Sequence, residues 1–200
     1  MENSNTMVPP PLPPENTSAS ATKVNISTEK LFGAIGLIFI FFSIIPLVGL
    51  LFWFAGYILL TIGMYQLSKR FNNPSLFNNF LIAVVLSILG WVIALVFGVI
   101  ASLSVSSVSH TVSSADLGVT VAFVTLYFIF LAVAYFYNKV FTSLALITKH
   151  NLFKIASITM VAGVVTSIIL VGFIIMFVGW LLLVIAFFTA PNEVEVRSSH

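Results

Sequence analysis

The sequence contains no cysteine and very little charge, and each shortage excludes a class of function. Without cysteine the chain has no disulfide, no iron–sulfur cluster and no thiolate nucleophile. Asp, Glu, Lys and Arg together make up 7% of the 200 residues, against roughly a quarter in a soluble domain. A chain so poor in charge cannot cover a soluble globule with polar groups. The fold must therefore be built from the apolar residues, which form 60% of the chain.

The ionisable side chains that remain avoid the long apolar runs. The acids are Glu2, Glu15, Glu29, Asp116, Glu193 and Glu195, and the histidines are His110, His150 and His200. No two histidines have the helical spacing that a haem or metal site on one helix needs. We therefore predict no catalytic, cofactor-binding or metal site. Nucleic acid is not an expected partner, because Lys and Arg are scattered over several short segments.

The apolar residues form runs long enough to cross the hydrocarbon of a bilayer, which is ~30 Å thick. With a mean hydropathy of +1.14, the chain is predicted to be all-α, a polytopic transmembrane helical bundle of six spans. The spans are expected at about 31–45, 50–67, 78–101, 119–138, 153–171 and 173–190. They make up a membrane domain at 29–191. A disordered, proline-rich cytoplasmic tail is expected at 1–28, and a short cytoplasmic tail at 192–200.

The two outer pairs of spans must each contain a reversal. As one helix, the run 153–190 would be roughly 57 Å long at ~1.5 Å per residue, far more than a bilayer holds. Gly172 is the expected break, with a positive φ, and Pro46 is expected to end the first span. The arms are short, so re-entrant hairpins are the alternative. The connector 139–152 is expected to be an interfacial helix or an extension of the fourth span.

Six spans place every cation on one side of the membrane. The eight are Lys23, Lys30, Lys69, Arg70, Lys139, Lys149, Lys154 and Arg197. The positive-inside rule makes that side cytoplasmic, so we expect a cell-membrane protein with both termini inside. Tyr65, Tyr135 and Tyr137 are expected at the cytoplasmic boundary, and Trp53 at the outer one. Acidic lipid headgroups are candidate ligands of Lys69, Arg70, Lys149, His150 and Lys154.

A glycine-spaced segment occurs twice, which predicts an internal repeat. Residues 47–63 align without gaps with 170–186 and match at eight of seventeen positions. The small residues of the two copies are spaced by seven, about two helical turns, so each trio lines one face of its helix. Small residues let helices approach closely in lipid. The predicted helix-packing residues are Gly49, Gly56 and Gly63 in the first copy, and Gly172, Gly179 and Ala186 in the second.

The polar groups within the spans are uncharged. Six hydroxyls are expected to bond to carbonyls of their own helices: Ser43, Thr61, Ser87, Thr125, Thr166 and Ser167. The loop 102–118 carries His110, Ser113, Ser114 and Asp116, the residue types of a Ser–His–Asp site. A serine-rich loop contains such a set by chance and lacks the rigid scaffold that catalysis needs. We therefore expect no enzyme.

Two segments carry a family resemblance. They are "KLFGAIGLIFIFFSIIPLVGLLFWFAGYILLTIGMYQLSKRFNNPSLFNNFLI" at 30–82 and "LFKIASITMVAGVVTSIILVGFIIMFVGWLLLVIAFFTAP" at 152–191. Both resemble the archaeal membrane proteins of the domain of unknown function 996 family. The resemblance implies a small multi-pass protein and brings no activity with it.

Two functions follow from this sequence. The preferred one is a non-enzymatic structural, scaffold or accessory subunit, with membrane lipids, other membrane proteins or further copies of the chain as partners. The alternative is a small transporter or channel with an uncharged, hydroxyl-lined path. A continuous polar stripe inside the bundle would favour the alternative, and a dry interior would count against it.

Overall fold

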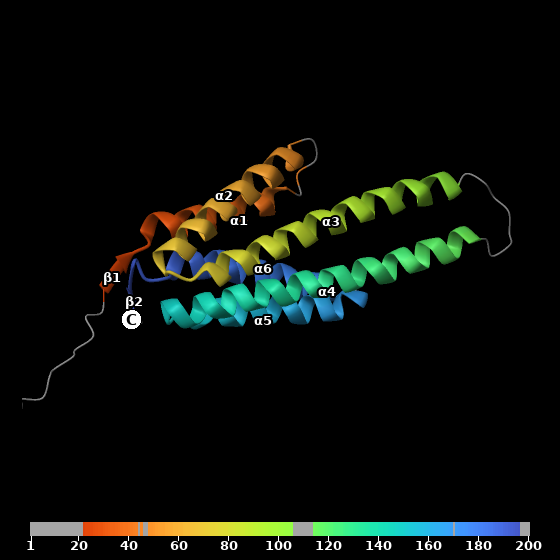
Figure 1. Ribbon diagram of the computed structural model, residues 1–200. Coiled ribbons are helices and arrows are strands. Elements are labelled where there is room, and N and C mark those ends of the chain that lie inside the picture. Colours follow the sequence, from red (N-terminus) through yellow and green to blue (C-terminus); the bar gives the residue numbers. More distant parts are fainter. Residues whose placement is uncertain (1–21, 44, 46–47, 106–113, 170, 197–200) are drawn as a thin grey trace, which may run out of the picture.

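The computed structural model describes residues 22–196, apart from 44, 46–47, 106–113 and 170 (Figure 1). The elements in chain order are β1 Thr22–Asn25, α1 Ser27–Phe42, α2 Gly49–Arg70, α3 Pro74–Val105, α4 Ser114–Thr148, α5 Asn151–Val165, the 3-10 helix η1 Thr166–Ile168, α6 Val171–Thr189 and β2 Glu193–Val196. Helices α2 to α6, with η1 extending α5, are long and apolar enough to cross a membrane. Helix α1 has 16 residues and is shorter than a usual span.

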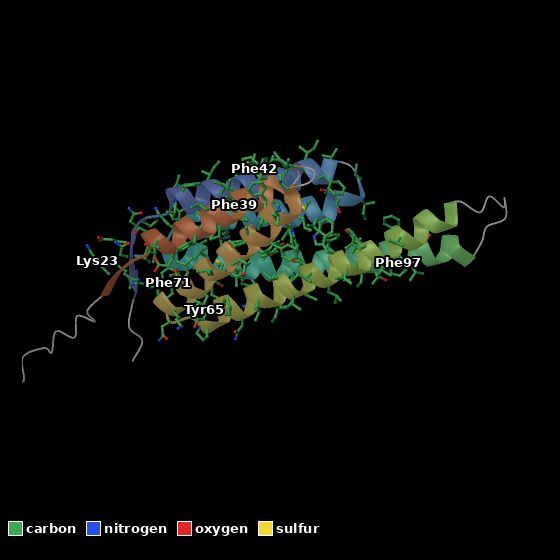
Figure 2. The ribbon with its side chains drawn as sticks, turned by 90° about the horizontal axis from the view of Figure 1, so that it is seen from above. Lys23, Phe39, Phe42, Tyr65, Phe71 and Phe97 are labelled. Carbon is green, nitrogen blue, oxygen red and sulfur yellow. The ribbon has the colours of Figure 1, made fainter. Side chains whose placement is uncertain are left out.

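The helices form a closed ring in chain order. Each helix packs against the next, and α6 packs against α1 to complete the circuit. Helices α1 and α2 form one short hairpin, α5 and α6 form another, and α3 and α4 form a longer pair that extends beyond both (Figure 1). Helices α2 and α3 diverge from the turn that joins them (Figures 1 and 2). We call the end that carries β1 and β2 the strand end, and the opposite end the tip end.

The strand end ties the two ends of the described chain together. Strands β1 and β2 pair antiparallel, with Lys23 opposite Glu195. Lys30 Nζ donates a hydrogen bond to the carbonyl of Ala190 at 2.7 Å. Residues 22–28 and 193–196 were predicted to belong to the two tails. In the structure they form the two strands and the start of α1. The compositional argument overlooked these strands because they form only by pairing of segments from opposite ends of the described chain. Residues 1–21 and 197–200 lie outside the described residues.

The reversal between α5 and α6 differs from the prediction. Gly172 does not have a positive φ, and among the described residues only Asn72 and Lys149 do. The chain instead turns through η1 and Ile169, whose backbone is extended at φ −101° and ψ 133°. Gly172 lies in the first turn of α6, where a Cβ would overlap the backbone of Ser167. The glycine is thus explained by close approach rather than by dihedral freedom. Pro46 lies outside the described residues.

Helix α4 settles the two alternatives for the connector 139–152. It runs unbroken to Thr148, so most of the connector is an extension of the fourth helix. Val140 and Leu144 are buried there, which gives the extension an apolar face to pack. Lys149 then ends the helix with a φ of 54°. The seven described Lys and Arg residues lie in the strand-end half of the bundle, where Figure 2 labels Lys23.

An aromatic core crosses the strand-end half. Ring contacts run from Phe80 on α3 through Tyr137 and Phe141 on α4 to Phe187 on α6 and Phe153 on α5. All five side chains are at most 5% exposed. Phe187 also lies against Gly33 of α1, so the core contacts five helices. The rings of these helices thus form one buried cluster in the strand-end half of the bundle.

Candidate functional site

A cavity of about 570 Å³ lies on the tip side of the aromatic core. Side chains from all six helices line it, and most of them are apolar or aromatic. Its volume falls within the roughly 300–1,000 Å³ of small-molecule sites. The short hairpins place the ends of α1 and α6 beside the cavity. Figure 2 shows the relative lengths, because Phe97 on α3 lies farther from the strands than Phe42 at the end of α1.

All three tryptophans of the chain line this cavity. They are Trp53 on α2, Trp91 on α3 and Trp180 on α6. Trp91 is 53% exposed, so it lies at the edge of the cavity, while Trp53 and Trp180 are half-buried. An indole N–H can only donate a hydrogen bond. None of the three donates to any residue that the structure describes.

Four hydroxyl-bearing residues line the cavity, and three of them lie together. Tyr57, Ser87 and Tyr137 face one another from α2, α3 and α4. Ser87 Oγ donates to the carbonyl of Ala83 at 2.7 Å. Tyr137 is 5% exposed, yet its hydroxyl has no hydrogen bond of good geometry to any described residue. A buried hydroxyl without a partner is rare, because it has lost its water and gained nothing.

The two hairpins present matching positions to the cavity. With the spacing of the predicted repeat, Trp53 corresponds to Met176 and Tyr57 corresponds to Trp180, and all four line the cavity. The same spacing carried into the first helix of each hairpin relates Leu37 to Met160 and Phe41 to Val164. These four also line it. The cavity is therefore lined on one side by positions that the predicted repeat pairs, and on the other by α3 and α4.

The six predicted helix-packing residues are all buried. A Cβ on Gly56 would stand 2.7 Å from the carbonyl oxygen of Gly36, and one on Gly63 would stand 3.0 Å from that of Glu29. A Cβ on Gly179 would meet Met160 on α5. Gly49 and Gly172 each lie against the backbone that precedes their helix, and Ala186 is fully buried beside Leu183 and Phe187. Each glycine thus faces its own hairpin.

Local hydrogen bonding of the hydroxyls is confirmed for five of the six residues. Each donates to a carbonyl three or four residues earlier: Thr61, Ser87, Thr125, Thr166 and Ser167. The Ser43 side chain makes no such bond to a described residue, and it lines the cavity instead. His110 and Ser113 lie outside the described residues, as do the side chains of Ser114 and Asp116.

The cations expected to meet lipid headgroups are partly engaged within the chain. Arg70 Nε lies 3.0 Å from Glu29 Oε1, and that carboxylate is buried. Lys149 Nζ lies 4.0 Å from Glu195 on β2. Lys69 Nζ lies 4.6 Å from the ring centre of Tyr65. Lys154 is exposed at the start of α5. Two of these cations, Arg70 and Lys149, thus lie near acidic side chains of the same chain. Headgroup binding by the predicted cations stays a prediction.

Sequence reasoning missed the cavity residues because it assigned aromatic side chains by depth alone. Tyr137 was placed only by its depth, at the cytoplasmic boundary, and the structure shows that its side chain is also buried within the bundle. Trp53 was likewise expected at a boundary and lines the cavity. The predicted repeat offered a clue to the cavity, because it pairs Tyr57 with Trp180 and both are large amphipathic rings. Such rings need a polar neighbour when they are buried.

The five long apolar helices and the uncharged lining of the cavity are consistent with a membrane-embedded helical protein. The chain belongs to the family described as protein of unknown function DUF996, whose model matches residues 52–181. That match includes the serine-rich loop, which the resemblance seen in the sequence leaves out. An uncharacterised protein of Methanocaldococcus jannaschii is 28% identical over 179 residues, which cover 86% of this chain and 97% of that protein. No solved structure matches.

Proposed function

We propose that the chain is a non-enzymatic structural, scaffold or accessory subunit of the cell membrane, with a six-span domain at 29–191. The observation that carries this proposal is the closed interior. The aromatic core joins five helices across the strand-end half, and no Asp, Glu, His, Lys or Arg lines the described cavity. Proton transfer and metal-assisted chemistry both require such groups. Other membrane proteins, further copies of the chain and membrane lipids are the proposed partners.

The proposed topology has both termini in the cytoplasm. Helix α1 is about 24 Å long at ~1.5 Å per residue, less than the hydrocarbon thickness, so its span depends on local thinning or on its packing against α2. Clustering of the described cations at the strand end supports a cytoplasmic strand end. The absence of cysteine makes this directly testable by introducing single cysteines. A membrane-impermeant maleimide added to intact cells is expected to label Gly118→Cys and to leave Lys69→Cys and Lys149→Cys unlabelled. Labelling of Lys69→Cys would overturn the topology.

The proposed role of the glycine stripes is to bring the helices of each hairpin into backbone contact. Support comes from the buried positions of the stripe and the short Cβ distances at Gly56 and Gly179. In lipid, dispersion between closely packed backbones replaces the hydrophobic drive that water supplies to soluble bundles.

The alternative is a small transporter that uses the hydroxyl-lined cavity as half of its path. The facing hydroxyls of Tyr57, Ser87 and Tyr137 favour it, and the aromatic core beyond them counts against it. Purification in mild detergent with identification of bound proteins separates the two functions. A stoichiometric complex supports the accessory role. A lone protein that makes liposomes permeable to a solute contradicts it and favours transport.

A further inference from the structure

The Tyr137 hydroxyl is the strongest indication that the cavity holds a ligand. The side chain is 5% exposed, lines the cavity and has no hydrogen-bond partner among the described residues. The nearest side-chain hydroxyls belong to Tyr57 and Ser87, and Ser87 already donates to Ala83. A bound molecule with a hydrogen-bonding group would give this hydroxyl the well-oriented hydrogen bond that the neighbouring Tyr57 and Ser87 hydroxyls do not provide.

The lining indicates which hydrogen-bonding group the ligand carries. Three tryptophans line the cavity, and their indole N–H groups, which can only donate, have no acceptor among the described residues; the phenolic hydroxyls of Tyr57 and Tyr137 can each donate or accept. Backbone carbonyls of the surrounding helices are occupied by the helices themselves. Donors are therefore in excess, and the group that complements them is an acceptor oxygen.

The charge and shape of the lining restrict the rest of the molecule. No Asp, Glu, His, Lys or Arg lines the cavity, so an ionised ligand would be buried without a counter-charge. Trp53, Trp91 and Trp180 offer flat faces, against which planar rings pack favourably. We propose that the cavity binds a neutral, membrane-soluble molecule with a planar ring and a carbonyl oxygen, the chemistry of a quinone head group, and that the carbonyl accepts a hydrogen bond from Tyr137.

Entry from the hydrocarbon fits the arrangement of the helices. Trp53 and Tyr57 line the cavity from α2, and Ser87 and Trp91 line it from α3. These are the two helices that diverge from their common turn (Figure 1). Trp91 is 53% exposed although it lines the cavity, so this edge faces the surroundings of the bundle. A lipid-soluble molecule would reach the site between α2 and α3, and this part of the inference depends on the membrane placement proposed above.

The position of the tryptophans gives a direct assay. Because all three line the cavity, the intrinsic tryptophan fluorescence of the full chain reports on this site. The chain is placed in nanodiscs of phosphatidylcholine and titrated with menadione, a methylated two-ring quinone. We expect saturable quenching with a stoichiometry of one. 2-Methylnaphthalene has the same rings and methyl group without carbonyls, and we expect it to compete at least tenfold less well.

Two substitutions assign the hydrogen bond. Tyr137→Phe is expected to weaken menadione binding about tenfold, since one hydrogen bond is removed. Tyr57→Phe is expected to weaken it less, and Tyr65→Phe at the strand end is the matched control that should leave it unchanged. Circular dichroism checks that each variant is folded. If Tyr137→Phe does not fold, Tyr57→Phe provides the test.

Three results would overturn the inference. They are quenching that rises without saturation, equal binding by folded Tyr137→Phe and the unmodified chain, and equal competition by 2-methylnaphthalene. Quenching without saturation would mean that the cavity holds only water or lipid tails. None of these results bears on liposome flux or on partner purification, so failure here is distinguishable from failure of the proposed function.

Discussion

The hairpins α1–α2 and α5–α6 share one pattern of small residues but pack in different ways. In the first, Gly36 and Gly56 bring two backbones together, and a Cβ on either would stand within 2.8 Å of main-chain atoms of the other helix. In the second, each glycine faces a methionine of the other helix, Gly179 against Met160 and Gly163 against Met176. Two glycines thus approach each other in one hairpin, whereas in the other a glycine lies against both the main chain and the side chain of a methionine.

The hairpins also differ at the strand end. Glu29 is buried in α1 and paired with Arg70 of α2. The corresponding positions in the second hairpin hold Leu152 and Glu193, and Phe153 packs edge-on against Phe187 instead. A charged pair in one copy therefore stands where the other copy relies on aromatic packing. The predicted repeat stays a prediction, and the following experiments sharpen it by asking whether equivalent positions behave equivalently.

The largest effect is expected at the glycine that begins the second helix of each hairpin. A Cβ on Gly49 would overlap the Ser43 carbonyl, and one on Gly172 would overlap Thr166 and Ser167. We expect Gly49→Ala and Gly172→Ala each to lower the free energy of unfolding by about 3 kcal/mol, since main-chain atoms cannot move aside. Titration with sodium dodecyl sulfate in mixed micelles measures it.

Gly98→Ala provides the matched control, because nothing lies within 4 Å of the added methyl group on α3. Alanine has the higher helix propensity, so this variant is expected to be unchanged or slightly more stable. If only one of Gly49→Ala and Gly172→Ala is destabilising, the two positions are not equivalent.

The next effect distinguishes the two kinds of contact. For Gly56→Ala we expect a loss of about 2 kcal/mol, because the methyl group meets the Gly36 carbonyl at 2.7 Å. For Gly179→Ala we expect a smaller loss, about 1 kcal/mol, because the nearest atom is the movable Cγ of Met160 at 2.6 Å and the nearest main-chain atom, Met160 N, is farther away at 2.9 Å. Unfolding titrations compare the two.

A double substitution makes the comparison sharper. Adding Met160→Ala to Gly179→Ala should recover part of the loss, whereas adding Ile40→Ala to Gly56→Ala should not. Recovery in both hairpins would show that side chains limit both contacts.

The ion pair gives the third effect. Arg70→Ala leaves the buried Glu29 carboxylate without its partner, and we expect a loss of about 1.5 kcal/mol, less than for a fully buried pair because the Arg70 side chain is 54% exposed. Glu29→Gln should cost less, since no charge remains buried. The same titration measures both, with Lys154→Ala as the exposed control. A larger loss for Glu29→Gln than for Arg70→Ala would contradict this account.

Much of the architecture followed from elementary limits on length and charge. The ~38-residue apolar run had to reverse because a bilayer is too thin to hold it, and α5 and α6 show that reversal. The place of the turn was predicted less well. A glycine signals either positive φ or close approach, and sequence alone did not distinguish these at Gly172. Similarly, β1 and β2 depend on pairing between opposite ends of the chain, which no local pattern reveals.

The cavity could not be predicted from the sequence, for a different reason. Its lining comes from all six helices, so it exists only once the ring has closed. Hydropathy treats Tyr57 and Tyr137 as mildly apolar ring residues and says nothing about which hydroxyls face one another. Burial of Tyr137 without a hydrogen-bond partner is a property of the packed bundle, not of any segment.

The smallest effect concerns a position at which the second hairpin carries a polar group and the first does not. Ser157 Oγ lies 3.0 Å from Asn138 Oδ1 on α4 and 2.9 Å from the Lys154 carbonyl of its own helix, so its single proton is shared between the two acceptors, while the corresponding residue in α1 is the fully buried Ala34. We expect Ser157→Ala to lower the free energy of unfolding by about 0.6 kcal/mol, the usual size of such a bond between membrane helices. Asn138 keeps a partner in Thr142 at 3.3 Å, which limits the loss.

Introducing a serine at the corresponding position of the first hairpin tests whether the stabilising effect of Ser157 depends on its contact with α4. Ala34→Ser introduces a hydroxyl into the tightly packed interior of the first hairpin, where Asn138 does not reach, and we expect it to cost more than Ser157→Ala. Equal losses from the two substitutions would mean that the neighbouring helix contributes nothing. The difference between the hairpins would then lie in their own helices rather than in what they pack against.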